Sequence, residues 1–170
     1  MRVLFSSGPP ETDPTAGAHL ERLGHQVLLE HPLIGAVQVV LTGDAEIRQL
    51  NASFRGVDQA TDVLSFSYGD APPLPAGEDA VVGEVYISLD RAAAQAAEQA
   101  VPLLEELGRL MVHGLLHLAG YEHDTEVELE AMERDTEAML ALMVPARGAA
   151  GLSGTAATGS APDTQVAPPT

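Results

Sequence analysis

Residues 102–120 read PLLEELGRLMVHGLLHLAG, and this stretch predicts the central helix of the fold. Leucines recur along it at helical spacing, so one face is expected to lie in the core. Pro102 suits the first turn, where a helix leaves an amide unbonded in any case. Gly120 can adopt a left-handed conformation and end the helix. The predicted core face carries four leucines: Leu103, Leu107, Leu110 and Leu115.

Strands and helices alternate on both sides of this stretch. Upstream, the spacing of apolar residues predicts strands at 2–7, 36–43, 61–68 and 81–88, and helices at 14–31, 44–55 and 89–100. Asp44 or Thr42 is expected to cap the second of these helices. Downstream, Thr125 and Glu128 have the spacing of a capping box at the start of a helix over 125–143. The order predicts an α/β (α+β) fold, with a small mixed, mostly parallel sheet that bears helices and with the 102–120 helix near its open edge.

The composition separates one domain from a tail. The first 145 residues are long enough for a single domain with a sizeable core. The last 25, ARGAAGLSGTAATGSAPDTQVAPPT at 146–170, hold no aromatic residue and many Gly, Ala, Ser, Thr and Pro. Such a segment cannot bury enough apolar area to offset its ordering entropy, so we expect it to be disordered.

Charge and cysteine content exclude several function classes. The net charge is -17, with eight arginines and no lysine, which argues against a general nucleic-acid binder. Any nucleic-acid function must therefore depend on a local site. The chain has no Cys, so disulfides and thiolate chemistry are excluded. No apolar run reaches membrane-spanning length and no signal-type start is present, so we expect a cytoplasmic protein without a membrane segment.

The stretch HGLLHLAGYEHD, at 113–124, carries three of the six histidines. His113 and His117 are four residues apart, which stacks both imidazoles on one helix face. After the reversal at Gly120, His123 can approach the same ion from the other side. Three neutral imidazoles leave one tetrahedral position for water, which is typical of a catalytic metal site. Packing in the core is the alternative, and it is disfavoured for three histidines within eleven residues; the other three, His19, His25 and His31, are expected at the surface or at helix ends.

The same histidine spacing occurs in one group of zinc proteases. Those enzymes need a Glu directly after the first histidine as general base. Here that position is Gly114, so peptide hydrolysis by that route is disfavoured. Without such a partner, water on the metal is itself the expected nucleophile, at a lowered pKa.

Three stretches together resemble a known family. HGLLHLAGYEHD, LNASFRGVDQATDVLSFSYG at 50–69 and VGEVYIS at 82–88 are similar to the characteristic stretches of the YbeY family of ribosomal-RNA maturation endoribonucleases. The resemblance extends from Leu41 to Met143. It implies a single-strand-specific, metal-dependent endoribonuclease that acts in ribosomal RNA 3'-end maturation and ribosome quality control. Ribosomal subunits and assembly factors are its implied partners.

The resemblance also implies the site residues. His113, His117 and His123 match the family's ligands to one Zn²⁺ per chain, and with Arg55 they are the expected catalytic residues. From the residues alone, Arg55 follows a predicted helix, and its planar fork suits a phosphodiester. The alternative from spacing alone is a surface salt bridge with Asp58 or Glu46, which the resemblance makes less favoured.

Two carboxylates have open roles. Asp62 is adjacent to a predicted strand start, and we favour capping or pairing with Arg55 over direct catalysis. Glu106 lies seven residues before His113 on the same helical face. It is expected either to orient an imidazole or to pair with Arg109, and the sequence favours neither.

Two other functions stay open from the sequence. One is a metallohydrolase that acts on peptides or small molecules. The other is a non-catalytic zinc-binding ribosome-assembly factor, whose ion would have a fourth protein ligand. For an RNA enzyme, the acidic charge has two explanations: Arg2, Arg22, Arg48, Arg55 and Arg91 converge on one side, or partners at the ribosome position the RNA.

Overall fold

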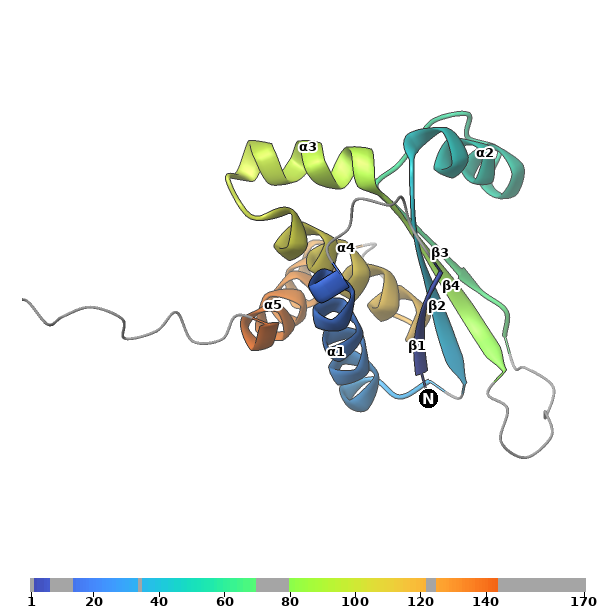
Figure 1. Cartoon of the computed structure of the whole chain (residues 1–170). Coiled ribbons are helices and arrows are strands. Elements are labelled where there is room, and N and C mark those ends of the chain that lie inside the picture. The colour runs from blue at the N-terminus through green and yellow to red at the C-terminus, as the bar shows by residue number, and fades with distance from the viewer. Residues whose placement is uncertain (1, 7–13, 34, 70–79, 122–124, 144–170) are drawn as a thin grey trace, which may run out of the picture.

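The computed structural model describes residues 2–6, 14–33, 35–69, 80–121 and 125–143. In this part of the chain it contains β1 (Arg2–Ser6), α1 (Pro14–Glu30), β2 (Ala36–Thr42), α2 (Asp44–Arg55), β3 (Val63–Ser67), β4 (Val81–Ser88), α3 (Leu89–Gln99), α4 (Leu103–Leu118) and α5 (Glu126–Met143) (Figure 1). Every helix and strand predicted from the sequence is present. The predicted tail at 146–170 lies outside the described residues. None of the described helices combines the length and the apolar character needed to cross a bilayer.

Over the described ranges, the sheet has four strands in the order β1-β2-β4-β3. β1, β2 and β4 are parallel, and Val39 of β2 is level with Val85 of β4. β3 is antiparallel to β4, with Leu64 opposite Tyr86, and it forms one edge of the sheet. The predicted mixed and mostly parallel sheet is confirmed.

Helix α4 occupies the centre of the molecule. α1, α4 and α5 lie together on one side of the sheet, and α3 follows the end of β4 (Figure 1). α4 packs against α1, α3 and α5 and against strands β3 and β4. Leu107, Leu110 and Leu115 are buried as predicted, but Leu103 is 40% exposed. The prediction for Leu103 was wrong because this residue begins the helix, beyond the reach of the core.

Two glycines let α4 approach the sheet closely. A Cβ on Gly114 would lie 2.5 Å from Val85 Cγ1 and 3.0 Å from Ser65 Oγ. The Ser65 hydroxyl donates to the Gly114 carbonyl at 3.1 Å. On strand β4, a Cβ on Gly83 would lie 2.9 Å from Cδ1 of Leu118, the last residue of α4. A side chain at position 114 therefore has no space, which gives a physical reason for the missing protease-type Glu.

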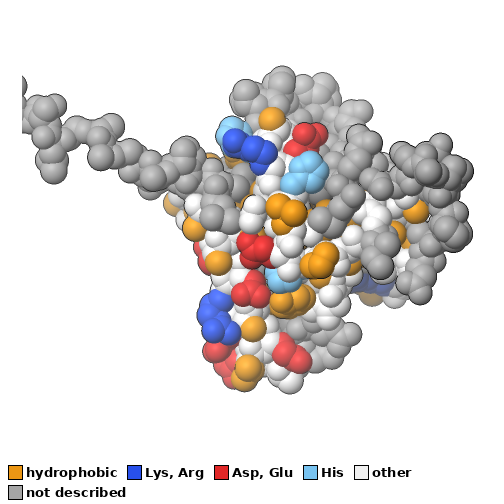
Figure 2. All heavy atoms as spheres, turned by 90° about the horizontal axis from the view of Figure 1, so that it is seen from below, with side chains coloured by type: hydrophobic (Ala, Val, Ile, Leu, Met, Phe, Trp, Pro, Cys, Tyr) orange, Lys and Arg blue, Asp and Glu red, His pale blue; other side chains and the backbone are white. Residues whose placement is uncertain are grey.

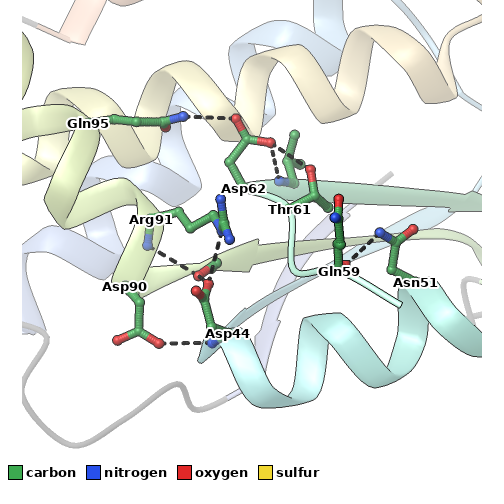
Figure 3. Close-up of polar contacts among 10 residues, drawn as sticks. Asp44, Asn51, Gln59, Thr61, Asp62, Asp90, Arg91 and Gln95 are labelled. Atoms are coloured by element: carbon green, nitrogen blue, oxygen red, sulfur yellow. Dashed lines mark hydrogen bonds and ion pairs between the residues drawn. The ribbon is translucent and has the colours of Figure 1, made fainter. Parts of the chain in front are cut away.

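The helix starts agree only partly with the predictions. The capping box of α5 is confirmed: the Thr125 amide donates to Glu128 Oε2 at 3.0 Å, and the Glu128 amide donates to Thr125 Oγ1 at 3.3 Å. The prediction that Asp44 or Thr42 caps α2 was wrong. The N-cap residue is Gly43, which has no side chain to accept a hydrogen bond from the first turn. Instead the Asp44 amide donates to Asp90 Oδ2 of α3 at 2.8 Å (Figure 3).

Candidate active site

Two histidines of α4 face each other. His113 and His117 are half-buried. Their Nε2 atoms are 3.1 Å apart, and the rings meet edge to face, with centroids 4.6 Å apart and an interplanar angle of 84°. Two nitrogens bound to one tetrahedral zinc ion at 2.0–2.1 Å would be separated by about 3.4 Å. The pair therefore has nearly the separation that a shared ion requires.

The turn after α4 fixes the orientation of His117. Gly120 has a φ of 91°, and the Tyr121 amide donates to the Leu116 carbonyl at 3.0 Å, which closes the helix end as predicted. This reversal brings the Tyr121 carbonyl to 3.0 Å from His117 Nδ1. Because a carbonyl only accepts, Nδ1 carries the proton and the lone pair stays on Nε2. The Tyr121 ring in turn packs edge-on against His31, with centroids 5.2 Å apart.

The third predicted ligand, His123, lies outside the described residues. Within the described ranges, no group of three His, Cys, Asp or Glu side chains lies close enough to hold an ion. The structure therefore places His113 and His117 together, and the role of His123 stays a prediction.

Arg55 shares a hollow with the histidine pair. The hollow has a volume of about 390 Å³ and separates the end of α2 from α4. Arg55 is the last residue of α2, and Gly56 turns the chain away with a φ of 71°. Arg55, His113 and His117 line the hollow together with these residues: Thr61, Asp62, Val63, Ser65, Ser67 and Leu118.

The surface ion pairs considered for Arg55 are not formed. Asp58 binds Arg48 through two hydrogen bonds of 2.7 and 2.9 Å. Glu46 accepts a hydrogen bond from the Thr42 hydroxyl. Both candidate carboxylates thus have other partners, and the Arg55 side chain is exposed at the mouth of the hollow.

Asp62 lines both this hollow and a second one. It accepts hydrogen bonds from the Val63 amide at 2.8 Å, the Thr61 hydroxyl at 3.1 Å and Gln95 Nε2 at 3.0 Å (Figure 3). Burial raises the pKa of its carboxyl, but the hydrogen bonds from Gln95, Val63 and Thr61 outweigh burial, so the pKa lies below its ordinary value. The predicted capping role is confirmed, whereas no ion pair with Arg55 is present among the described side chains.

The second hollow, of about 460 Å³, is lined by residues that include Asp62, Gln95, Glu106 and His113. Sequence reasoning missed Gln95. Its contact with Asp62 joins α3 to the start of β3, across 33 residues of sequence. A contact between residues so far apart in sequence cannot be predicted from local sequence patterns.

Glu106 is buried and paired. Its side chain is 2% exposed and forms an ion pair with Arg109. Arg109 also binds Glu137 of α5 at 3.2 Å, so the three residues join α4 to α5. Burial lowers the pKa of Arg109, but the contacts with Glu106 and Glu137 more than offset it and raise the pKa. The pairing alternative for Glu106 is therefore confirmed.

Three of the five arginines considered for RNA binding line hollows of the described structure, but they do so in two different places. Arg48 and Arg91 line a third hollow of about 610 Å³, where Arg48 pairs with Asp58, and Arg91 Nε lies 3.3 Å from Asp44 Oδ1. On the face drawn in Figure 2, basic side chains lie apart with acidic ones between them. Among the described residues, Arg55 is therefore the one arginine of these five that lines the hollow of the histidine pair.

Comparison with known proteins identifies the family. The YbeY family, described as endoribonuclease YbeY, matches residues 14–143. Proteins named endoribonuclease YbeY are similar in Gloeobacter violaceus (46% identity, 71% of this chain and 64% of that protein) and in Rhodopseudomonas palustris (45%, 61% and 54%). The matched region is thus less than two thirds of those two proteins. The Pelotomaculum thermopropionicum protein of the same name is 46% identical, over 82% of this chain and 95% of that protein.

A solved structure supports the same fold. The solution structure of a Thermotoga maritima protein is 26% identical, with a TM-score of 0.55 over 82% of this chain and 90% of that one. The family match covers more than half of the chain, and the expected resemblance is confirmed. The chain belongs to the YbeY family of endoribonucleases.

Proposed function

We propose that this chain is a zinc-dependent endoribonuclease that cleaves single-stranded ribosomal RNA at the hollow between α2 and α4. The observation that carries the proposal is the shared lining of that hollow: an exposed arginine on one side and a facing histidine pair on the other. A phosphodiester needs a cation for its negative oxygens and a group that activates the phosphorus for attack. This hollow offers candidates for both.

The residues present fit a divalent ion. His113 and His117 would hold it through Nε2, and His123 is the proposed third ligand. The fit rests on the 3.1 Å separation of the two Nε2 atoms and on the Nδ1 contact of His117, which puts the ring proton on Nδ1 and the lone pair on Nε2. Neutral imidazoles favour zinc, and the ion would supply Lewis-acid chemistry to a phosphoryl oxygen or to water.

Arg55 is the proposed phosphate-binding residue. Its guanidinium can donate two parallel hydrogen bonds to one phosphate. Among the described residues, no carboxylate forms an ion pair with it. The end of α2 and the turn at Gly56 place the side chain at the mouth of the hollow.

The proposed biological role follows from the family resemblance. We assign the chain to ribosomal RNA 3'-end maturation and ribosome quality control in the cytoplasm, with ribosomal subunits and assembly factors as partners. The net charge of -17 repels free RNA, and of the five arginines considered only Arg55 is among the described residues that line the hollow of the histidine pair. Positioning of the RNA by ribosomal partners is therefore the better of the two explanations for the acidic charge.

Of the two rival functions, peptide hydrolysis has less support. A protease-type Glu at position 114 would collide with Val85 and Ser65. A non-catalytic assembly factor would keep the ion but lack hydrolysis.

Cleavage assays with purified protein and zinc test the proposal. The substrates are a single-stranded ribosomal RNA fragment, the same fragment annealed to its complement, and casein. We expect cleavage of the single strand alone. Cleavage of casein would support a metallohydrolase acting on peptides instead. An ion that binds without any RNA cleavage would support the assembly factor.

A further inference from the structure

Aromatic residues gather on the sheet face opposite α4. The chain has only six Phe and Tyr residues. Phe54 of α2 contacts Phe66 of β3 at 5.0 Å between ring centroids, and Phe66 contacts Tyr86 of β4 at 5.9 Å. Tyr68 directly follows β3, and burial together with the Glu84 carboxylate raises the pKa of its hydroxyl to about 12. We name these four residues the aromatic face: Phe54, Phe66, Tyr68 and Tyr86.

Two rings of the aromatic face are exposed to solvent. Phe54 is 69% exposed and Tyr68 is 55% exposed. Phe54 is thus the most exposed of the described aromatic residues, although its ring already contacts Phe66. An exposed ring held by a neighbouring ring offers one open π-face, which is the surface that a nucleobase needs for stacking.

The aromatic face is continuous with the proposed active site around the edge strand. Ser65 and Ser67 of β3 line the hollow that contains Arg55, whereas Phe66 between them points to the opposite face. Within the described ranges, β3 is an edge strand, and no described strand lies beyond it at this edge of the sheet. Phe54 directly precedes Arg55, so a nucleotide whose phosphate is bound by Arg55 has its base within reach of the Phe54 ring.

We propose that Phe54 stacks on an unpaired base of single-stranded RNA next to the phosphate that Arg55 binds. This inference rests on the proposed function. A base within a duplex is already stacked and paired, so the contact selects single strands. Glu84 lies opposite Phe66 and accepts a hydrogen bond from the Tyr86 hydroxyl at 2.9 Å. Its carboxylate repels phosphates, which restricts the aromatic face to bases and leaves the phosphate to Arg55.

A tryptophan at position 54 tests the stacking directly. The chain has no Trp, so Phe54→Trp introduces a single fluorophore that keeps the ring. Oligouridylate added without metal should quench its fluorescence, because a stacked base quenches indole. The matched control is Leu29→Trp on α1, where the native residue is 70% exposed, and its fluorescence should not change. Equal quenching of both variants, or of neither, overturns the inference.

A second variant tests the contribution of the ring to affinity. Phe54→Leu keeps an apolar contact with Phe66 and removes the π-face. Its Kd for a labelled single-stranded oligonucleotide, measured by fluorescence anisotropy, should rise about tenfold. An oligonucleotide with an abasic site at the stacked position should bind wild type and Phe54→Leu equally. An unchanged Kd for the intact oligonucleotide overturns the inference.

The outcomes separate this inference from the proposed function. Quenching and weakened binding without any cleavage of RNA by the wild type would contradict the proposed function and support the stacking. Cleavage by the wild type with an unaltered Kd in Phe54→Leu would contradict the stacking alone.

Discussion

Helix α4 and the segment from Arg55 to Val63 both contribute residues to the same hollow, but different forces hold them. α4 is surrounded by the core, and Leu107, Met111 and Leu115 are buried on it. The segment is held by polar contacts: Asn51 Nδ2 donates to the Gln59 carbonyl at 2.7 Å, and Arg48 binds Asp58. His113 and His117 thus belong to a helix packed in the core, whereas Arg55 is exposed to solvent.

The difference in packing suits α4 to metal binding and the segment from Arg55 to Val63 to substrate binding. Metal ligands must be held within a few tenths of an ångström, which a packed helix provides. A substrate must enter and leave, which favours exposed contacts of low local stability. Substitutions on α4 should therefore affect metal content or stability, whereas substitutions on the segment should affect RNA and leave the ion in place.

The largest effect is expected from His117→Ala on α4. Loss of one ligand should remove the ion, and cleavage should fall about 10³-fold, since the ion contributes several kcal/mol to the transition state. Metal content by mass spectrometry and RNA cleavage measure both effects. Exposed His25 of α1 provides the control variant His25→Ala, which should change neither. Unchanged metal content in His117→Ala would reject the ligand assignment.

In the segment from Arg55 to Val63, Arg55→Glu should separate substrate binding from metal binding. Cleavage should fall about 10²-fold through loss of charge stabilisation at the phosphate, with metal content and melting temperature unaltered. Arg22→Glu on α1 makes the same charge change at an exposed residue and should leave cleavage near the wild-type rate. Equal losses in both variants would show that only net charge matters.

Gly114→Ala tests the close packing of α4. The added Cβ would meet Val85 Cγ1 at 2.5 Å, so the variant should lose about 2 kcal/mol of unfolding free energy. Gly17→Ala is the matched control, because a Cβ there would meet no described atom within 4 Å apart from its chain neighbours and the backbone of its own helix. In α1 it should instead gain about 0.5–1 kcal/mol from helix propensity. Urea denaturation measures both, and a stabilised Gly114→Ala would contradict the packing described for α4.

The smallest effect on stability is expected from Gln95→Leu, which changes the polar contacts of Asp62. It removes one hydrogen bond to Asp62, so the carboxyl pKa should rise toward 3.8, and stability near neutral pH should fall by about 1 kcal/mol. The pKa of Asp62 is depressed in the fold. The ionised carboxylate therefore contributes its full stabilisation above pH 3.8, and this stabilisation is lost as the pH falls through the lower pKa of the folded state. At that pH the stabilities of wild type and Gln95→Leu should converge.

Carboxyl NMR titration together with denaturation at several pH values measures this change. Gln99→Leu in the same hollow is the control, with no change in the pKa of Asp62 expected. An Asp62 pKa that is equal in wild type and Gln95→Leu would reject the hydrogen bond as a cause.

The sequence predicted the features that depend on local spacing. The helices and strands followed from periodicity, and the facing of His113 and His117 followed from their separation by one helical turn. The meeting of Arg55 with the histidines did not follow from spacing, which alone favoured a surface ion pair. The family resemblance suggested it, and the fold supplies the reason: β3 returns beside α4 directly after the segment that follows Arg55.

The features that sequence reasoning missed are long-range. The partner of Asp62 is Gln95 on another helix, and the cap of α2 comes from Asp90 on α3. The acceptor for His117 Nδ1 is the Tyr121 carbonyl, a group that every residue possesses. Of the residues at that turn, only Gly120 predicted the reversal from sequence, and its φ of 91° confirms the left-handed conformation.

The most direct test of the paired histidines and Arg55 as one site is metal content and cleavage measured on the same purified protein. Zinc per chain and the rate on a single-stranded RNA should be determined before chelation, after chelation and after zinc is restored. We predict one zinc per chain, loss of cleavage with the ion, and recovery when zinc returns. Full cleavage by protein that contains no metal would contradict the account.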